Sequence, residues 1–227
     1  MCDNEVIVLY EGYSTKIDDG TMSANCSCTL IKTPEKNIIV DTMTAWDKDK
    51  ILAALALHNI TPKDIHYVIC SHSHADHIGN NNLFTEAIQH IVGTTVHQKN
   101  IFYEKNLKYS DYEICKGVLV RYTPGHTAED ISVIVDGKFN GENVKVGITG
   151  DLFEKREDVA DPTIWITLGN SELNVQQADS RWQIANAVDV IIPGHGPYFK
   201  VTTDIKSKLF NQFDQLIVYQ SMKRRDE

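Results

Sequence analysis

A dense group of residue types able to bind metal ions lies at residues 71–80, which read S-H-S-H-A-D-H-I-G-N. His72, His74, Asp76 and His77 fall within six consecutive positions. Alternate residues of an extended chain project to the same side, so His72 and His74 share a face, and a turn brings Asp76 and His77 beside them. Imidazole and carboxylate groups together suit zinc, iron or manganese. Because such groups are costly to bury unpaired, the spacing predicts a metal site.

Two metal ions need more ligands than these four, and three further candidates stand in turns of small residues. Each follows an expected apolar strand, and each turn contains a glycine, which lets the backbone fold close to a site. They are His126 in T-P-G-H-T, Asp151 in T-G-D and His195 in P-G-H-G. One such motif alone is typical of an ordinary turn. The same placement three times, behind H-x-H-x-D-H, predicts a centre with two metal ions.

The other histidines and the cysteines indicate no second centre of comparable specificity. Among the five cysteines, Cys26 and Cys28 stand two apart in an expected strand. Zinc binding is one interpretation of this pair, and burial of small reduced side chains is the other. No Ser-His-Asp set or activated cysteine competes with the metal motifs. The histidines interpreted as ordinary surface or core residues are His58, His66, His90 and His97.

The elements that must position the ligands follow from the apolar pattern. We expect strands at residues 6–10, 26–32, 37–40, 67–70, 92–96, 118–122, 131–135, 144–149 and 188–192. We expect helices at residues 46–57, 81–91, 172–187 and 205–220. Two strand-rich halves with interleaved helices predict one four-layer α/β domain over residues 1–227. The apolar stripe of the last helix fits packing on the chain's own core, with a dimer contact as the alternative.

The composition is that of a globular protein, with 42% hydrophobic and 23% charged residues among 227. The net charge of -9 provides no general attraction for phosphate backbones or anionic membranes. The N-terminus does not read as a signal peptide, and no apolar run reaches the roughly 18 residues of a transmembrane helix. With cysteines whose spacing suggests no disulfide framework, these features predict a cytoplasmic or nuclear location and no membrane partner.

The order of the ligand motifs resembles the metallo-β-lactamase superfamily. H-x-H-x-D-H comes first, and His126, Asp151 and His195 follow in turn. The resemblance implies an αββα sandwich with two metal ions at one edge. It implies a first metal held by His72, His74 and His126, a second held by Asp76, His77 and His195, and a bridge between them by Asp151. Asp41, in V-D-T, matches a carboxylate that typically supports one of the ligands.

Such a centre predicts hydrolysis. Two cations about 3.5–4 Å apart lower the pKa of a shared water toward neutrality, and the resulting hydroxide attacks a carbonyl carbon or a phosphorus. Asp76, which would orient the hydroxide and take its proton, and Asp151 are the expected catalytic carboxylates. Zinc is the expected metal, with iron and manganese as alternatives. Candidates for the rim of the cavity, each equally well explained by ordinary packing, are Tyr103, Tyr109 and Trp165.

A closer resemblance, over nearly the whole chain, is to a group of small members of this superfamily. It rests on V-I-V-L-Y-E-G-Y, H-S-H-A-D-H-I-G-N-N-N-L-F, D-I-S-V-I-V, G-D-L-F-E-K and P-G-H-G-P-Y-F-K-V. The resemblance implies a homodimeric endoribonuclease acting on RNA phosphodiesters, of the kind associated with histone pre-mRNA 3′ ends, although the charge of -9 weighs against RNA. The alternative is a thioesterase like glyoxalase II, which T-P-G-H-T fits, or another small-molecule hydrolase. A metal-binding protein without catalysis is disfavoured by the complete ligand set.

Overall fold

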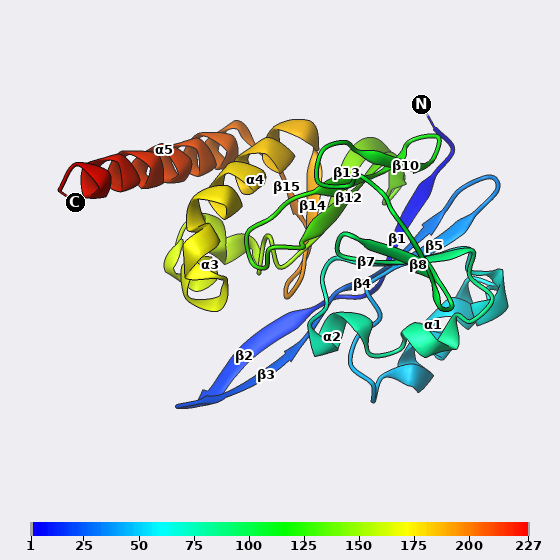
Figure 1. Cartoon of the computed structure of the whole chain (residues 1–227). Coiled ribbons are helices and arrows are strands. Elements are labelled where there is room, and N and C mark those ends of the chain that lie inside the picture. The colour runs from blue at the N-terminus through cyan, green and yellow to red at the C-terminus, as the bar shows by residue number, and fades with distance from the viewer. Residues whose placement is uncertain (1, 227) are drawn as a thin grey trace.

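The computed structural model describes residues 2–226 (Figure 1). Its α-helices are α1 (Lys48–Leu57), α2 (Ala75–Ile78), α3 (Thr163–Leu168), α4 (Asn174–Ala187) and α5 (Thr203–Asp226). Its short 3-10 helices are η1 (Pro62–Asp64), η2 (Asn81–Leu83), η3 (Arg156–Val159) and η4 (Ser171–Leu173). Its strands are β1 (Glu5–Tyr10), β2 (Tyr13–Asp18), β3 (Thr21–Asn25), β4 (Cys28–Lys32), β5 (Asn37–Val40), β6 (Tyr67–Cys70), β7 (Gln89–Val92), β8 (Thr95–Gln98), β9 (Ile101–Tyr103), β10 (Tyr112–Cys115), β11 (Val118–Tyr122), β12 (Ile131–Phe139), β13 (Glu142–Gly150), β14 (Val190–Pro193) and β15 (Phe199–Lys200).

The central strands of both halves are buried on both faces. In β5, Ile38 lies in the central core, whereas its neighbour Ile39 packs on the outer side. In β14, Ile192 joins the same central core, whereas Ile191 packs on the opposite outer side. Successive side chains of a strand point to opposite faces, so each half shares one apolar face with the other half and presents a second face outward.

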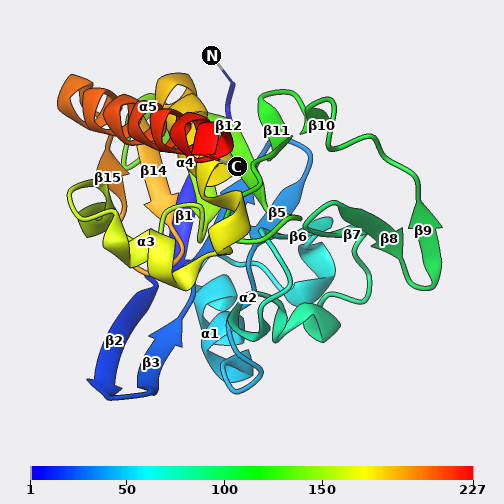
Figure 2. The ribbon, with the colours of Figure 1, turned by 60° about the vertical axis from the view of Figure 1, so that its left-hand side comes forward.

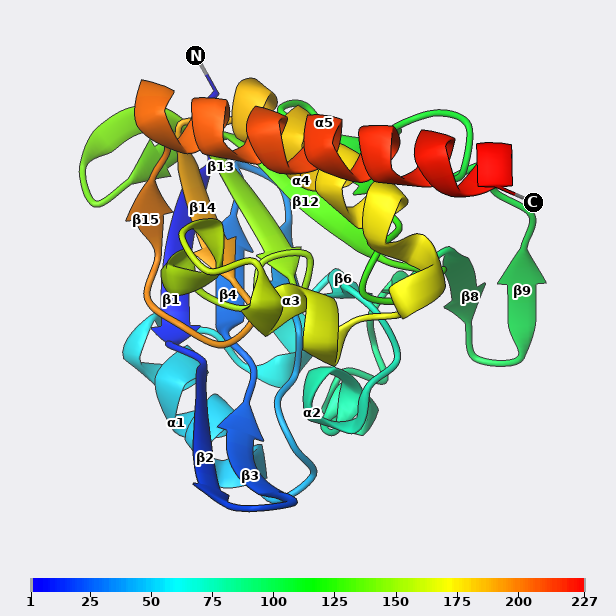
Figure 3. The same ribbon diagram turned by 90° about the vertical axis from the view of Figure 1, so that its left-hand side faces the viewer.

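Helices cover the two outward faces. Ile51 and Leu55, one turn apart on α1, pack on the outer face of the first half. Ile184 of α4 and Leu209 of α5 pack on the outer face of the second half. Figures 1, 2 and 3 show α4 and α5 on one side of the strands and α1 on the other. The result is the four-layer αββα sandwich that the sequence predicts.

The topology brings several strand ends to one edge. The strands pair in the order β15-β14-β13-β12-β1-β4-β5-β6-β7-β8-β9, with β11 also beside β12. Strands β5 and β6 are parallel, as are β13 and β14, and the two halves meet where β1 pairs with β12. The Ile131 N–H, at the start of β12, donates to the Ser71 carbonyl at 2.9 Å, just beyond the end of β6. The carboxyl ends of β6, β11, β13 and β14 therefore lie together.

Strands β2 and β3 form a separate two-stranded hairpin. It turns at Asp19 and Gly20, within the D-D-G motif of residues 18–20, and Gly20 has a φ of 93°. Figures 1 and 3 show the hairpin projecting from the body next to the α1 and α2 side. Ile17 and Met22 on this hairpin are 64% and 51% exposed, so it presents apolar side chains away from the core.

The helix predicted at residues 81–91 is wrong. Only the 3-10 turn η2 forms there, and β7 begins at Gln89. Strand β7 lies parallel to β6 and pairs Tyr67 with Gln89, which buries Ile91 in the central core. This long-range pairing overrides the local helical spacing. The strand predicted at 92–96 is also wrong, because Gly93, with a φ of 52°, turns the chain between β7 and β8.

The strands predicted at 37–40, 67–70 and 118–122 have those bounds, and the other predicted elements are present with shifted bounds. The strand expected at 26–32 begins at Cys28, and the last helix extends to Asp226 instead of ending at residue 220. Within residues 2–226, no helix combines the length and the apolar character that crossing a membrane requires.

Candidate metal centre

All seven candidate ligands lie at the edge where the strand ends meet. His72 and His74 follow β6, and Asp76 and His77 stand on the short helix α2. The three remaining ligands, each in the turn after β11, β13 or β14, are His126, Asp151 and His195.

Two glycines allow these turns to approach one another. Gly150 has a φ of 50°, and a Cβ there would collide with the Ser71 side chain. A Cβ on Gly194 would collide with the carboxylate of Asp151. The Gly194 N–H donates to the Gly150 carbonyl at 3.0 Å, and the His195 N–H donates to the Glu154 carbonyl at 2.7 Å. Gly150 and Gly194 therefore permit the close approach of the ligand-bearing turns that the sequence predicts.

Four of the ligands converge on one point. The His74 Nδ1 lies 2.8 Å from the His72 Nε2 and 3.1 Å from the His126 Nε2. The Asp151 Oδ2 lies 3.6 Å from the His72 Nε2 and 3.4 Å from the His126 Nε2. One nitrogen of each histidine and one carboxylate oxygen thus surround a position suited to a single cation, which is the first site that the resemblance implies.

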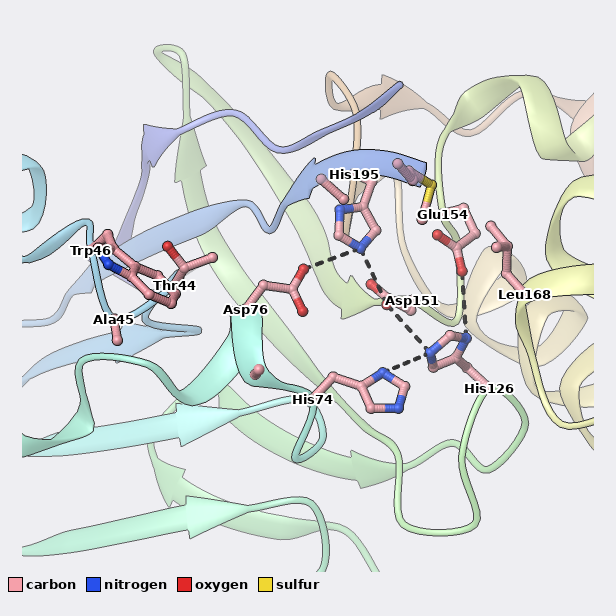
Figure 4. A pocket seen from close by; sticks show the side chains of 13 residues that line it. Thr44, Ala45, Trp46, His74, Asp76, His126, Asp151, Glu154, Leu168 and His195 are labelled. Carbon is pink, nitrogen blue, oxygen red and sulfur yellow. Dashed lines mark hydrogen bonds and ion pairs between the residues drawn. The ribbon is translucent and has the colours of Figure 1, made fainter. Parts of the chain in front are cut away.

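A second group adjoins the first through Asp151. The Asp151 Oδ1 lies 3.2 Å from the His77 Nε2, and the Asp151 Oδ2 lies 3.3 Å from the His195 Nε2. The Asp76 Oδ2 lies 3.7 Å from the His195 Nε2 and 3.9 Å from the His77 Nε2. Figure 4 shows Asp151 between His126 on one side and His195 on the other. The carboxylate of Asp151 therefore stands where a bridge between two cations would stand.

Unpartnered buried atoms show that cations fit this arrangement. The His77 Nε2 and the Asp151 Oδ1 are both buried, and although they lie 3.2 Å apart, neither makes a well-formed hydrogen bond in the described part of the chain. Buried polar atoms without partners are rare in folded proteins, and a shared cation would satisfy both. Nitrogen and carboxylate ligands in this number suit two divalent ions such as zinc, iron or manganese.

Asp41 lies where the resemblance places a supporting carboxylate. Its Oδ2 is 3.0 Å from the His77 Nδ1, so the opposite ring nitrogen of His77 faces the centre. Its Oδ1 accepts the Ser71 N–H at 2.7 Å. Asp41 has a φ of 58°, a backbone conformation that the bonds to Ser71 and His77 hold in place. Asp41 thus orients a ligand and also fixes the start of the ligand-bearing segment.

The electrostatics of the protein residues divide the histidines into two groups. Burial opposes protonation of His77, but Asp151 and Asp41 outweigh it and raise its pKa well above the usual value. Burial likewise opposes protonation of His195, but Asp151 raises its pKa to about 9. Burial lowers the pKa of His126 to about 4. Protons on His77 and His195 would have to leave before those nitrogens could bind a cation.

A buried ion pair holds the segment that carries Asp151. The Arg181 Nη2 of α4 lies 2.6 Å from the Asp158 Oδ1, and both side chains are fully buried. The Arg181 Nη1 donates to the Leu152 carbonyl at 2.7 Å, and the Asp158 Oδ2 accepts the Glu154 N–H at 2.8 Å. Nothing in the local sequence around Arg181 or Asp158 indicated this network, because its partners come from separate elements.

The substitution Arg181→Met tests the structural part of this network. It leaves the Asp158 carboxylate buried without its partner, so we expect a loss of about 3–5 kcal/mol in the free energy of unfolding, measured with urea. The matched control Arg156→Met removes an exposed arginine from η3 and should change stability by less than about 0.5 kcal/mol. A loss below about 1 kcal/mol for Arg181→Met would show that the pair does not hold the segment.

A cavity of about 590 Å³ opens above the ligands. Its floor is polar and its wall includes Met22 from the β2–β3 hairpin, Trp46 from the chain before α1 and Leu168 from the end of α3. Tyr103, Tyr109 and Trp165 do not line it, so the rim predicted from them is wrong. The lining residues are Met22, Ala24, Thr44, Ala45, Trp46, His74, Ala75, Asp76, His126, Asp151, Glu154, Leu168 and His195.

The predicted rim residues have other places. Trp165 is completely buried, and its ring lies 5.1 Å from the Arg181 guanidinium. Tyr109 is 86% exposed and lies outside the cavity. Trp46 is 90% exposed at the cavity wall. Sequence reasoning missed Trp46 because it interpreted this residue as the start of a helix, which in the structure begins at Lys48.

The class of protein follows from comparison with known sequences. Residues 24–195 match the sequence model of the metallo-β-lactamase superfamily, and this span contains all seven candidate ligands. The chain therefore belongs to this superfamily of metal-dependent hydrolases.

Particular relatives confirm the closer resemblance. The chain is 38% identical over 201 residues to Xenopus laevis metallo-β-lactamase domain-containing protein 1, covering 87% of this chain and 82% of that protein. It is 36% identical over 169 residues to the Mus musculus protein of the same name, covering 74% of this chain but only 62% of that protein. Among solved structures, an N-acyl homoserine lactone hydrolase with its product at the catalytic metal centre aligns with a TM-score of 0.61 and 21% identity, covering 86% of this chain and 93% of the other.

Proposed function

We propose that this chain hydrolyses an acyl ester, thioester or lactone bond in a small molecule that carries an apolar group. The observation that supports this most is the lining of the cavity. Apolar side chains of Met22, Trp46 and Leu168 stand above the candidate ligands, and the residues that line the cavity include no lysine or arginine. Cationic side chains usually hold the phosphates of a polyanionic substrate that lie beyond the metal ions, whereas an uncharged acyl group matches this wall.

RNA phosphodiester cleavage, which the closer resemblance implies, is the second candidate. It follows from the resemblance of the sequence motifs alone, because the match to the Xenopus laevis protein identifies the group and names no substrate. The net charge of -9 and the apolar wall weigh against it. The lactone hydrolase shares the fold at 21% identity, so the choice of an acyl substrate depends on the cavity of this chain and not on that neighbour.

The residues of the centre suggest how hydrolysis would proceed. Two divalent cations bound by the seven ligands would lower the pKa of water and polarise the acyl carbonyl. Asp76, 23% exposed and facing the cavity, can orient the attacking water and accept its proton. The water oxygen bonds to the acyl carbon, the bond from that carbon to oxygen or sulfur breaks, and the proton passes to the leaving group.

The substitution Trp46→Ala tests whether the wall binds the acyl group. Removing a large aromatic surface should raise KM for an octanoyl thioester by about tenfold or more, with a smaller change for the acetyl thioester. Steady-state kinetics on the zinc-loaded protein measures both. Tyr109→Ala is the matched control, because Tyr109 is an exposed aromatic residue outside the cavity.

The same protein should be assayed on a single-stranded RNA oligonucleotide. The proposal predicts acyl turnover and no RNA cleavage. Cleavage of RNA that disappears in Asp151→Ala, without turnover of any thioester or lactone, would replace the acyl substrate with RNA while leaving the metal centre in place.

A further inference from the structure

The carboxylate of Glu154 lies at the centre but is absent from the ligand set. Glu154 is 2% exposed and lines the cavity beside Asp151 and His195. Figure 4 shows its side chain directed toward His126 from the turn after β13. A buried acidic side chain requires a polar or charged partner. The roles predicted from the sequence motifs assign no such partner to Glu154.

Besides His126, three histidines turn their Nε2 toward the centre, and these three share one arrangement. Each has its Nδ1 close to an oxygen atom outside the ligand set. When a neutral imidazole donates its Nδ1–H to such an oxygen, the Nε2 lone pair is left free for a cation. The pairs are His72 with the Ser71 Oγ at 3.0 Å, His77 with the Asp41 Oδ2 at 3.0 Å, and His195 with the Asn25 carbonyl oxygen at 3.1 Å.

His126 also turns its Nε2 toward the centre. The oxygen atom that faces its other ring nitrogen, Nδ1, belongs to Glu154. The His126 Nδ1 lies 3.4 Å from the Glu154 Oε1. Both atoms are buried, and neither has a hydrogen-bond partner in the part of the chain that the structure describes. A small rotation of either side chain would satisfy both atoms at once.

The backbone around Glu154 fixes the position of its side chain. The Glu154 N–H donates to the Asp158 Oδ2 at 2.8 Å, and its carbonyl accepts the His195 N–H at 2.7 Å. Asp158 is in turn paired with the buried Arg181. The carboxylate therefore projects from a segment that is tied both to the second half of the sandwich and to the ligand turn of His195.

We propose that Glu154 is the positioning residue for His126. Its Oε1 accepts the His126 Nδ1–H and so holds the tautomer whose Nε2 lone pair faces the first metal site. This inference rests on the metal centre of the proposed function, but not on the acyl substrate. Metal binding and the state of the His126 ring can therefore be measured without any turnover.

The first experiment compares zinc affinities. Glu154→Leu removes the acceptor, so affinity at the first site should fall by about 10–100-fold, measured by competition with a chromophoric chelator. Glu154→Gln keeps an acceptor oxygen and should stay within about threefold of wild type. Glu157→Leu, which changes an exposed glutamate three residues away, is the matched control and should bind zinc like wild type.

The second experiment observes the His126 ring by long-range 1H–15N NMR on zinc-loaded protein. The wild type should show a slowly exchanging Nδ1–H resonance at low field. It should move upfield in Glu154→Gln, where a neutral acceptor replaces the carboxylate, and exchange away in Glu154→Leu.

Two results would overturn the proposal. One is wild-type zinc affinity in Glu154→Leu. The other is a His126 Nδ1–H resonance that Glu154→Gln leaves unchanged, and this measurement decides the matter even when Glu154→Leu fails to fold. A chain that binds zinc as expected but hydrolyses no acyl compound would contradict the proposed substrate and leave this inference intact.

Discussion

Asp151→Ala is expected to lose both metal ions and nearly all hydrolysis. The Asp151 Oδ2 lies within 3.6 Å of the His72, His126 and His195 Nε2 atoms, and its Oδ1 lies 3.2 Å from the His77 Nε2. It is the carboxylate that both groups of ligands share. Without it the metal content should fall from about two ions per chain to less than one, and turnover should fall by about a thousandfold or more, because water is no longer activated near neutral pH.

Metal content by inductively coupled plasma mass spectrometry, together with turnover, checks this expectation. Asp204→Ala is a suitable control, because Asp204 is exposed on α5. Its ion pair in the described part of the chain is with Lys208, which is not one of the candidate ligands. Full metal content with retained hydrolysis in Asp151→Ala would rule out the bridging role.

Asp76→Asn is expected to reduce turnover more than it reduces binding of the first metal. Asp76 belongs to the second group of ligands and faces the cavity, whereas His72, His74 and His126 form the first group without it. An amide can still approach a cation through its oxygen, but it cannot accept a proton from water. We expect kcat to fall by about 100–10,000-fold, the usual contribution of a positioned base.

Zinc titration that resolves the two sites, and a pH–rate profile, separate these effects. The first site should keep its wild-type affinity and the second should weaken. An Asp76→Asn variant whose pH–rate profile and metal count both match the wild type would assign the proton transfer to another group. Besides Asp76 and Asp151, the remaining carboxylate that lines the cavity is that of Glu154, which Glu154→Gln would then test.

The candidate ligands could be found from the sequence because their chemistry is concentrated. H-x-H-x-D-H places four metal-binding side chains in six residues, and few other roles explain such a cluster. The three distant candidates could be predicted because each follows an apolar strand and stands beside glycine. Gly194 shows the physical reason, since only a residue without a side chain can lie against the carboxylate of Asp151.

The surroundings of the ligands could not be found in the same way. Glu154, Asn25 and Arg181 act through partners far away in the sequence, and nothing in their local pattern distinguishes them from ordinary polar residues. The His195 Nδ1, for example, meets the carbonyl of Asn25, 170 positions earlier in the chain. Contacts of this kind depend on how the two halves of the sandwich face each other, which periodicity does not reveal.

The cavity wall was missed for a related reason. Residues 12–25 read as a polar segment with a D-D-G turn at residues 18–20, and no strand was expected there, because neither face of the β2–β3 hairpin carries a regular apolar stripe. Met22 and Ala24 nevertheless stand over the centre, since the hairpin projects from the body on the side where the strand ends meet. The helix expected at residues 81–91 fails because a parallel neighbour, β6, is available to pair with Gln89–Val92.

Anomalous diffraction at the zinc edge from crystals of zinc-loaded protein tests the central claim most directly. Two peaks per chain are expected, one among His72, His74 and His126 and one among Asp76, His77 and His195, with Asp151 between them. A single peak, or peaks away from these side chains, would contradict a dinuclear centre built from the seven residues.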